Sequence, residues 1–302
     1  MTNNWYKGLL AGILLLLPGI AVAQQAANQV IIVKSSDNAY FTQSIETLIS
    51  HVDKAVRFKV IMVKDLPDSI KDGDSGNLYV TLGQSAAEAV NRLDQPPRSI
   101  SAYLTLEQFK RLNGKNQLAV LLDQTLNRYL AFCKLMLAVD SVGILDEYPV
   151  KLEKQQSEFL GKLQMELRQY RIDPFNKLLP VLRQLLGQSD VLLMLPRQSI
   201  YNRDSLKGVL LTSYRNRKPV ISYSPAHVKS GALASIYSSP TDIGRHLALL
   251  LNKRLQNPGY KAPEYEYARF YSISTNRRVA RALDIDLPME SKLRSALDRL
   301  EP

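Results

Sequence analysis

The chain has 302 residues, 45% of them apolar, and its 39 basic and 28 acidic residues give a net charge of +11. This length accommodates two domains of ordinary size, each with a substantial core. Basic residues are interleaved with acidic ones, as between Arg277 and Asp286, and no block of about five or six like charges occurs. The charge therefore indicates a solvated basic surface and argues against a nucleic-acid partner.

The N-terminal residues have the pattern of a secretory signal peptide. Lys7 precedes an apolar run, Leu9 to Ile20, and the small residues Ala21 to Ala23 follow it. The run is shorter than the roughly 20 apolar residues of a membrane-spanning helix. We expect residues 1–23 to be removed, leaving a periplasmic protein that begins near Gln24 and is not stably inserted in the membrane. The alternative is an uncleaved N-terminal anchor helix. No lipid anchor is expected, because the cleavage position is not a cysteine.

Strands and helices alternate from the start of the predicted mature chain. The β-branched run Val30 to Val33 predicts a buried strand, and apolar residues at helical spacing predict a helix from Phe41 to Val52. Further strands are predicted at Phe58 to Val63 and at Leu78 to Leu82. Strands joined by helices in this way favour a parallel sheet, because each connection covers a sheet face.

The pattern restarts after Asp123 and predicts a second α/β half. The predicted elements are a helix at Leu126 to Leu137, a strand at Ser141 to Leu145, a polar helix at Lys151 to Arg171, a helix ending near Gly187, a strand at Val191 to Leu195, a helix at about Ser205 to Arg215 and a strand at Pro219 to Tyr223. No low-complexity linker separates the halves. We therefore expect several short connections between them instead of one flexible tether.

Candidate ligand-binding residues follow the predicted strands, because ligands of open α/β sheets bind outside the carboxyl ends of the strands. In the first half these residues are Ser36, Asp37, Gly83, Gln84 and Ser85, and in the second half they are Asp146, Glu147, Tyr148, Arg197, Gln198, Tyr223 and Ser224. If the halves face each other, the loops line one cleft. Tyr148 and Tyr223 are then expected to stack on a solute or to cover it. The alternative is that each tyrosine packs on its neighbouring helix.

One candidate loop also has the pattern of a helix start. Ser85 and Glu88 form the Ser-x-x-Glu pattern of a capping box directly after a predicted strand. The free amides of such a helix start attract carboxylates and phosphates. A capped helix with no ligand fits the pattern equally well.

The sequence contains no recognisable catalytic or metal-binding motif. His51, His227 and His246 are far apart, and no dinucleotide loop, Walker loop or hydrolase elbow occurs. The adjacent carboxylates Asp146 and Glu147 are expected to be solvated on a surface loop. The single cysteine, Cys133, lies in a helical pattern and is expected to be buried. The sequence thus predicts no enzyme, no cofactor and no metal site.

Several segments resemble the ABC-transporter substrate-binding family of the type I periplasmic-binding fold, whose members bind aromatic or other amino acids. The segments are Ser189 to Pro196, Pro219 to Ser224, Lys229 to Ser235, Ile273 to Asn276 and Ala280 to Pro288, with further similarity in Val80 to Ala87, Leu122 to Arg128 and Val142 to Leu145. Together they cover most of the predicted mature chain. The segment Gly231 to Ser235 is the most specific of them.

The resemblance implies two Rossmann-like lobes with parallel sheets, joined by a hinge of several strands, and no catalysis. By analogy, residues 28–121 and about 229–255 form the N-terminal lobe, and residues 122–228 and about 256–302 form the C-terminal lobe. The implied function is to bind an amino acid or a related small anion or zwitterion for an ABC importer, with an ABC permease as partner. The alternative is a stand-alone periplasmic receptor that presents its ligand state to a sensor or to an outer-membrane uptake system.

Two features depart from the family pattern. Arg197 stands where such proteins often have an acidic residue, and the loop around residues 96–112 lacks the usual strand-like segment that leads to an Asp-Pro pair. Because an amino-acid ammonium group requires a carboxylate, Arg197 puts the usual ligand in doubt. It suggests a second anionic group on the ligand, or a protein that has left transport.

Overall fold

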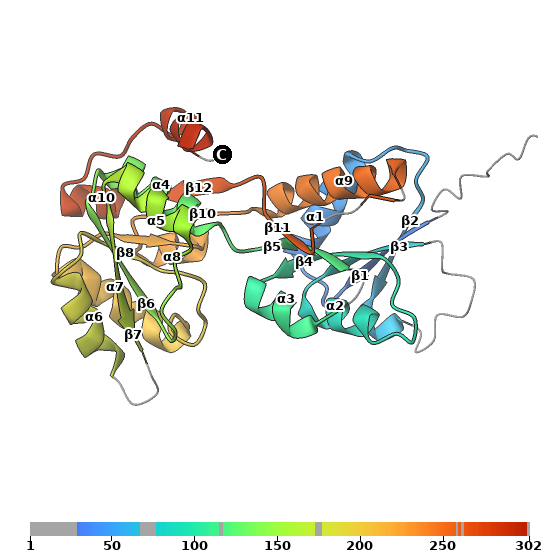
Figure 1. Cartoon of the computed structure of the whole chain (residues 1–302), viewed down its shortest axis with the longest axis horizontal. Helices are drawn as coiled ribbons and strands as arrows, with labels where there is room; N and C mark the ends of the chain where they lie inside the picture. Colours follow the sequence, from blue (N-terminus) through green and yellow to red (C-terminus); the bar gives the residue numbers. More distant parts are fainter. Residues whose placement is uncertain are drawn as a thin grey trace, which may run out of the picture.

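The structure is a computed structural model that describes residues 29–66, 77–114, 117–172, 177–257, 259–260 and 263–300. The expected signal peptide lies outside the described residues. The chain forms two lobes side by side, each built on a six-stranded sheet with helices around it (Figure 1). The predicted α/β fold with two mostly parallel sheets is thereby confirmed. Among the residues that the structure describes, no helix combines the length and apolar character needed to cross a membrane.

The sheet of the first lobe has the strand order β11-β5-β4-β3-β1-β2, and its pairings are all parallel. The strands are β1 (Val30–Lys34), β2 (Phe58–Met62), β3 (Leu78–Leu82), β4 (Ser99–Leu104), β5 (Gln117–Leu121) and β11 (Tyr265–Tyr267). Every residue of β3 and β5 is buried. Their mostly apolar sequences follow from this position, because a parallel sheet is covered on both faces.

Helices from distant parts of the sequence cover the first sheet. They are α1 (Ala39–Ser50), α2 (Gln84–Asn91), α3 (Leu106–Leu112) and α9 (Pro240–Gln256), with the short 3-10 helix η1 at Val63–Asp65. α9 lies beside α1 (Figure 1), and Gly244 allows their close approach. A Cβ atom at this glycine would lie only 2.5 Å from the carbonyl oxygen of Ser44.

The sheet of the second lobe has the strand order β12-β10-β9-β8-β6-β7, with β12 antiparallel to β10 and the other pairs parallel. Its strands are β6 (Ser141–Asp146), β7 (Glu166–Arg171), β8 (Val191–Leu193), β9 (Val220–Ser222), β10 (Ala234–Tyr237) and β12 (Ser272–Thr275). Its helices are α4 (Leu126–Leu137), α5 (Lys154–Leu163), α6 (Leu178–Leu186), α7 (Arg203–Arg215), α8 (Pro225–Ser230), α10 (Arg277–Leu283) and α11 (Glu290–Leu300). Cys133 of α4 is fully buried, as expected, and burial raises the pKa of its thiol.

One predicted helix and one expected absence of a strand are wrong. The polar helix expected at 151–171 ends at Leu163, because Gln164 takes a left-handed conformation with φ of 50° and β7 then pairs with β6. β7 is a half-exposed edge strand rich in charged residues, which explains its resemblance to a solvated helix. The region 96–112, expected to lack a strand, contains β4 followed by α3.

Three short segments cross between the lobes. The first crossover (residues 122–125) joins β5 to α4, the second (238–239) joins β10 to α9, and the third (268–271) joins β11 to β12. Sheet membership thus places the second and third crossovers later than the expected boundaries at 229 and 256. The difference arises because β10 completes the second sheet beside β9, and β11 completes the first sheet beside β5.

Candidate functional site

The most definite feature at the carboxyl ends of the second-lobe strands is an ion pair. Asp146 ends β6 and is only 3% exposed, and Arg197 follows β8. The Nε atom of Arg197 donates to Asp146 Oδ1 at 3.1 Å and to Oδ2 at 3.0 Å. Asp146 was expected to be solvated, and this expectation is wrong, because the β6 strand carries the carboxylate into the core. A buried carboxylate requires such a partner.

The charge of Arg197 also interacts with acidic groups of the first crossover and of the first lobe. Burial opposes its positive charge, but the hydrogen bonds and charge of Asp146, with the charges of Asp123 and Glu107, raise the pKa of Arg197 above its ordinary value. Glu107 belongs to α3 of the first lobe. Residues that follow strands of the two different sheets therefore lie within electrostatic reach of one another. The side chain of Arg197 remains 32% exposed.

Asp123, in the first crossover, is a site residue that sequence reasoning missed. Its Oδ2 atom accepts the Leu106 amide at 2.6 Å, at the start of α3. Burial raises the pKa of Asp123, and the Leu106 hydrogen bond and the Arg197 charge oppose this shift only in part. Asp123 follows β5, so the rule of strand carboxyl ends would have found it had residues 117–121 been predicted as a strand.

Aromatic side chains lie near these charges. Tyr223 follows β9, is half-buried and makes an edge-to-face contact with His227 at 4.8 Å between ring centroids. In the first lobe, burial raises the pKa of Tyr267 to about 12, and the charges of Asp123 and Glu153 add to the shift. Since Glu153 precedes α5 of the second lobe, Tyr267 stands where the lobes approach each other.

The other predicted residues of the second lobe differ in exposure. Tyr148 is 75% exposed, and Gln198 is exposed as well. Glu147 is partly exposed beside Asp146. Ser224 caps α8, since its Oγ atom accepts the Ala226 amide at 3.3 Å.

The predicted residues of the first lobe form a separate group around the start of α2. Ser36 accepts a hydrogen bond from the Asn38 amide at 2.9 Å, and Asp37 pairs with Lys34 at 2.6 Å. Gln84 bonds to Glu88 of its own helix and accepts from Gln108 of α3. In the part of the chain that the structure describes, hydrogen bonds join Asp146 to Arg197, but none joins these first-lobe residues to either of the two.

The predicted capping box at Ser85 does not form. The N-cap residue is Gly83, with φ of 91°, and Ser85 lies inside the first turn of α2. Ser35, from the loop after β1, supplies the cap instead, because its Oγ atom accepts the Ala86 amide at 2.9 Å. A Cβ atom on Gly83 would lie 2.7 Å from this Oγ atom, so the cap requires glycine at this position.

Hydrogen bonds tie the three crossovers together beside the site. Gln124 of the first crossover donates to Ser238 Oγ of the second at 2.9 Å, and Ser238 donates to the Phe270 carbonyl of the third at 2.8 Å. Buried Arg128 donates to Gln124 Oε1 at 2.5 Å and to the Ala268 carbonyl at 2.8 Å. The strands and the charged residues that follow them are thus held around one hydrogen-bonded set of crossovers.

One serine–histidine contact has the residue types of a nucleophile and base, but not the exposure. Ser222 Oγ lies 2.6 Å from His227 Nδ1, and Ser222 is fully buried. Burial also lowers the pKa of His227. The pair fastens α8 to the end of β9. Among the described residues, no group of three His, Cys, Asp or Glu side chains could hold a metal ion.

No protein-family model and no curated protein matches the sequence. Solved structures do match the fold. A ligand-free, open substrate-binding protein with adhesive properties from Clostridium difficile aligns with a TM-score of 0.63 and 14% identity, over 87% of this chain and 97% of its own. An ABC domain in complex with L-Trp from Streptococcus pneumonia aligns with a TM-score of 0.54 and 16% identity, over 88% and 97%. A conserved domain protein from Vibrio cholerae aligns with a TM-score of 0.53 and 17% identity, over 89% and 98%.

These similarities confirm the fold that the sequence resemblance implied. The chain has the two-lobed α/β architecture of type I periplasmic-binding proteins, and its structural neighbours include solute-binding proteins.

Proposed function

We propose that the protein is a periplasmic solute-binding protein that holds a small molecule between its two lobes and performs no catalysis. The observation that carries this proposal is the Asp146–Arg197 pair at the carboxyl ends of β6 and β8, together with Asp123, which follows β5 in the first crossover and whose charge acts on Arg197. Polar side chains from both lobes converge there at the carboxyl ends of parallel strands, where open α/β folds bind ligands.

The groups at this place favour a small polar solute with an aromatic or apolar part. Asp146 uses the Nε edge of Arg197, so the rest of the guanidinium is left to contact a carboxylate or another anion. Asp123 offers a carboxyl group to an ammonium or a hydroxyl. Tyr223 and Tyr267 offer ring faces. An amino acid or a related zwitterion satisfies all three chemistries, and an L-Trp-bound neighbour of the same fold supports this class.

The proposed setting is import through an ABC transporter, with export by the N-terminal signal and a permease as partner. Of the predicted ligand residues, Arg197 and Tyr223 are the ones that we propose contact the solute directly, and Asp146 orients Arg197. Tyr148 is the proposed cover at the rim. We propose lobe limits that follow the crossovers at 122–125, 238–239 and 268–271.

Mass spectrometry of protein purified without refolding tests the proposal. Native spectra are expected to show a bound small molecule that denaturation releases, since tight-binding receptors retain their solute. Calorimetric titration of the emptied protein with L-tryptophan, and with a pool of the common amino acids, follows. No retained small molecule, together with no binding heat from either titrant, would contradict the proposal.

A further inference from the structure

The last described helix, α11, packs on the second lobe. Its side chains Leu293 and Leu297 are buried in the core that α4 also contributes to. α11 and α4 lie against each other above the second sheet (Figure 1). The polar side of α11 therefore has a fixed position relative to the crossovers.

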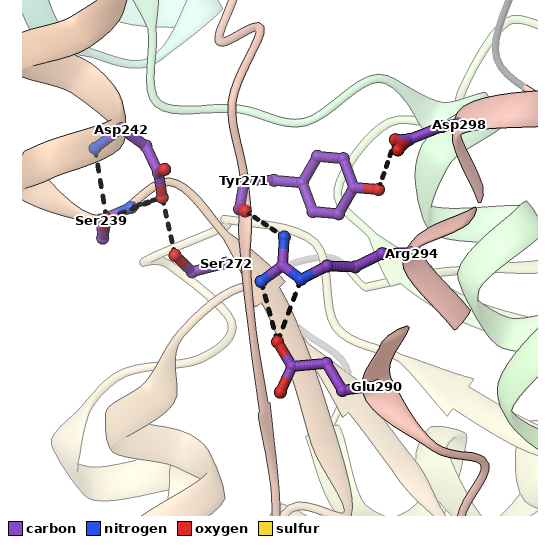
Figure 2. Close-up of polar contacts among 7 residues, drawn as sticks. All are labelled: Ser239, Asp242, Tyr271, Ser272, Glu290, Arg294 and Asp298. Atoms are coloured by element: carbon purple, nitrogen blue, oxygen red, sulfur yellow. Dashed lines mark hydrogen bonds and ion pairs between the residues drawn. The ribbon is translucent and has the colours of Figure 1, made fainter. Parts of the chain in front are cut away.

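This polar side holds Tyr271, the last residue of the third crossover (Figure 2). The Tyr271 hydroxyl donates to Asp298 Oδ1 at 2.8 Å, and Arg294 Nη1 donates to the Tyr271 carbonyl at 2.9 Å. Glu290 orients the same guanidinium, because its Oε1 atom accepts from Arg294 Nε at 3.0 Å and from Nη2 at 2.9 Å. Side chain and main chain of one crossover residue are thus both bonded to α11.

The ring of Tyr271 has two cationic neighbours. The guanidinium carbon of Arg128, in α4, lies 5.0 Å from the ring centroid, and that of Arg294 lies 5.3 Å from it. Both distances are within the range of favourable cation–π contacts. Both α4 and α11 of the second lobe therefore contact the Tyr271 ring of the third crossover.

The next residue along the chain is bonded to the opposite lobe. Ser272 Oγ donates to Asp242 Oδ2 at 2.7 Å, and Asp242 lies in the first turn of α9 (Figure 2). The same oxygen accepts the Ser239 amide at 2.9 Å and the Ser239 hydroxyl at 2.6 Å. Ser272 begins β12 of the second sheet, so its bond to Asp242 crosses between the lobes. With Tyr271 held by α11, rotation of one lobe against the other must break the Ser272–Asp242 bond, turn the crossover backbone before Tyr271, or release Tyr271 from α11.

We propose that α11 and Tyr271 form a clasp that sets the resting angle between the lobes and thereby regulates the affinity of the solute site without touching the solute. The inference rests on the proposed function, since a change in lobe angle affects affinity only if the lobes close on a ligand. Bonds present in one conformation favour that conformation. Releasing the clasp therefore raises the population of other lobe angles. Loss of one hydrogen bond to a charged group changes such a ratio by roughly tenfold.

Distance measurements on solute-free protein test the clasp. Spin labels on Lys59→Cys, in β2, and Lys207→Cys, in α7, report the separation of the lobes by pulsed electron paramagnetic resonance. Both positions are exposed, and the natural Cys133 is fully buried and unlabelled. Tyr271→Phe removes only the hydroxyl that bonds to Asp298, and Asp298→Ala removes the acceptor of the same bond. Asp298→Asn keeps an acceptor and is the conservative rescue.

The distance distribution is expected to broaden and shift in Tyr271→Phe and Asp298→Ala, and to stay close to the parent in Asp298→Asn. Lys292→Gln is the matched control, because it changes an exposed residue of α11 that is not part of the clasp. Unchanged distributions in both Tyr271→Phe and Asp298→Ala, with normal melting curves, would overturn the clasp. Failure of the proposed function would appear separately, as protein that binds no solute. It would not affect the distance measurement, which is made on solute-free protein.

Discussion

The side-chain amide of Gln124 donates to Ser238 Oγ at 2.9 Å and so joins the first crossover to the second. Gln124 is buried, and its carbonyl oxygen accepts from Arg128. One side chain of the first crossover therefore bonds both to α4 and to the second crossover, whose Ser238 is 114 residues away in the sequence.

Replacing the Gln124 side chain by an apolar one is expected to lower the free energy of unfolding. Gln124→Leu removes the acceptor of one Arg128 hydrogen bond and the donor to the Ser238 hydroxyl, which costs about 2 kcal/mol. Urea unfolding measures the loss. Gln43→Ala removes an exposed bond to Thr241 and is the control, with an expected change below about 0.5 kcal/mol. Equal stability of Gln124→Leu and parent would show that the crossover bonds contribute nothing.

Removal of Arg197 is expected to destabilise the second lobe, because it leaves the buried Asp146 carboxylate without its partner. For Arg197→Met the loss is about 2 kcal/mol, below that of a fully buried pair because Arg197 is partly exposed. The double variant Arg197→Met/Asp146→Leu should recover most of this loss but not solute binding. Unfolding curves and solute titrations of the parent, the single variant and the double variant measure these effects. A double variant no more stable than the single one would speak against the pairing argument.

Asp123→Asn is expected to raise stability at pH 7 by about 1 kcal/mol while weakening solute binding, the usual trade-off at functional sites. Burial raises the pKa of Asp123 above its ordinary 3.8, so the folded protein retains a proton that the unfolded chain releases. Stability from this residue therefore falls as the pH rises from about 4 through the folded pKa. Melting temperatures from pH 3 to pH 8 measure the slope, which should become shallower in Asp123→Asn.

Glu266 is expected to act in the opposite direction. Its hydrogen bond with buried His246, at 3.0 Å, lowers the pKa of the carboxyl below its ordinary 4.5. His246 Nδ1 accepts the Arg269 amide at 3.2 Å, so Nε2 is the donor to Glu266. This stabilisation is present above pH 4.5 and is lost as the pH falls through the folded pKa. In Glu266→Gln the acid-induced loss, about 1 kcal/mol, should disappear. An identical acid transition in both proteins would contradict this assignment.

The sequence predicted the elements whose pattern reflects a local cause. Val30 to Val33 and Leu78 to Leu82 are apolar runs because their strands are buried on both faces. β4 escaped prediction because two of its residues are serines, Ser99 and Ser101, which are nonetheless buried. Ser101 is accommodated by accepting a hydrogen bond from Thr81 of the neighbouring strand, at 2.8 Å. Such a pairing between strands cannot be read from either segment alone.

The candidate site was predictable to the same extent. The rule of strand carboxyl ends nominated Asp146 and Arg197, but it did not reveal that they bond to each other across 51 residues of sequence. The capping box at Ser85 was wrong for a related reason. A serine from a different loop, Ser35, caps the helix, and local sequence does not show which distant residue will do so.

Small-angle X-ray scattering tests most directly whether the protein binds a solute between its lobes. The profile is recorded for protein emptied of its retained solute by denaturation and refolding, and again after that solute, or L-tryptophan if it is the ligand found by titration, is added to saturation. We expect a smaller radius of gyration with solute, because closure of the lobes brings their centres together. An unchanged radius of gyration at saturating solute would contradict binding by lobe closure.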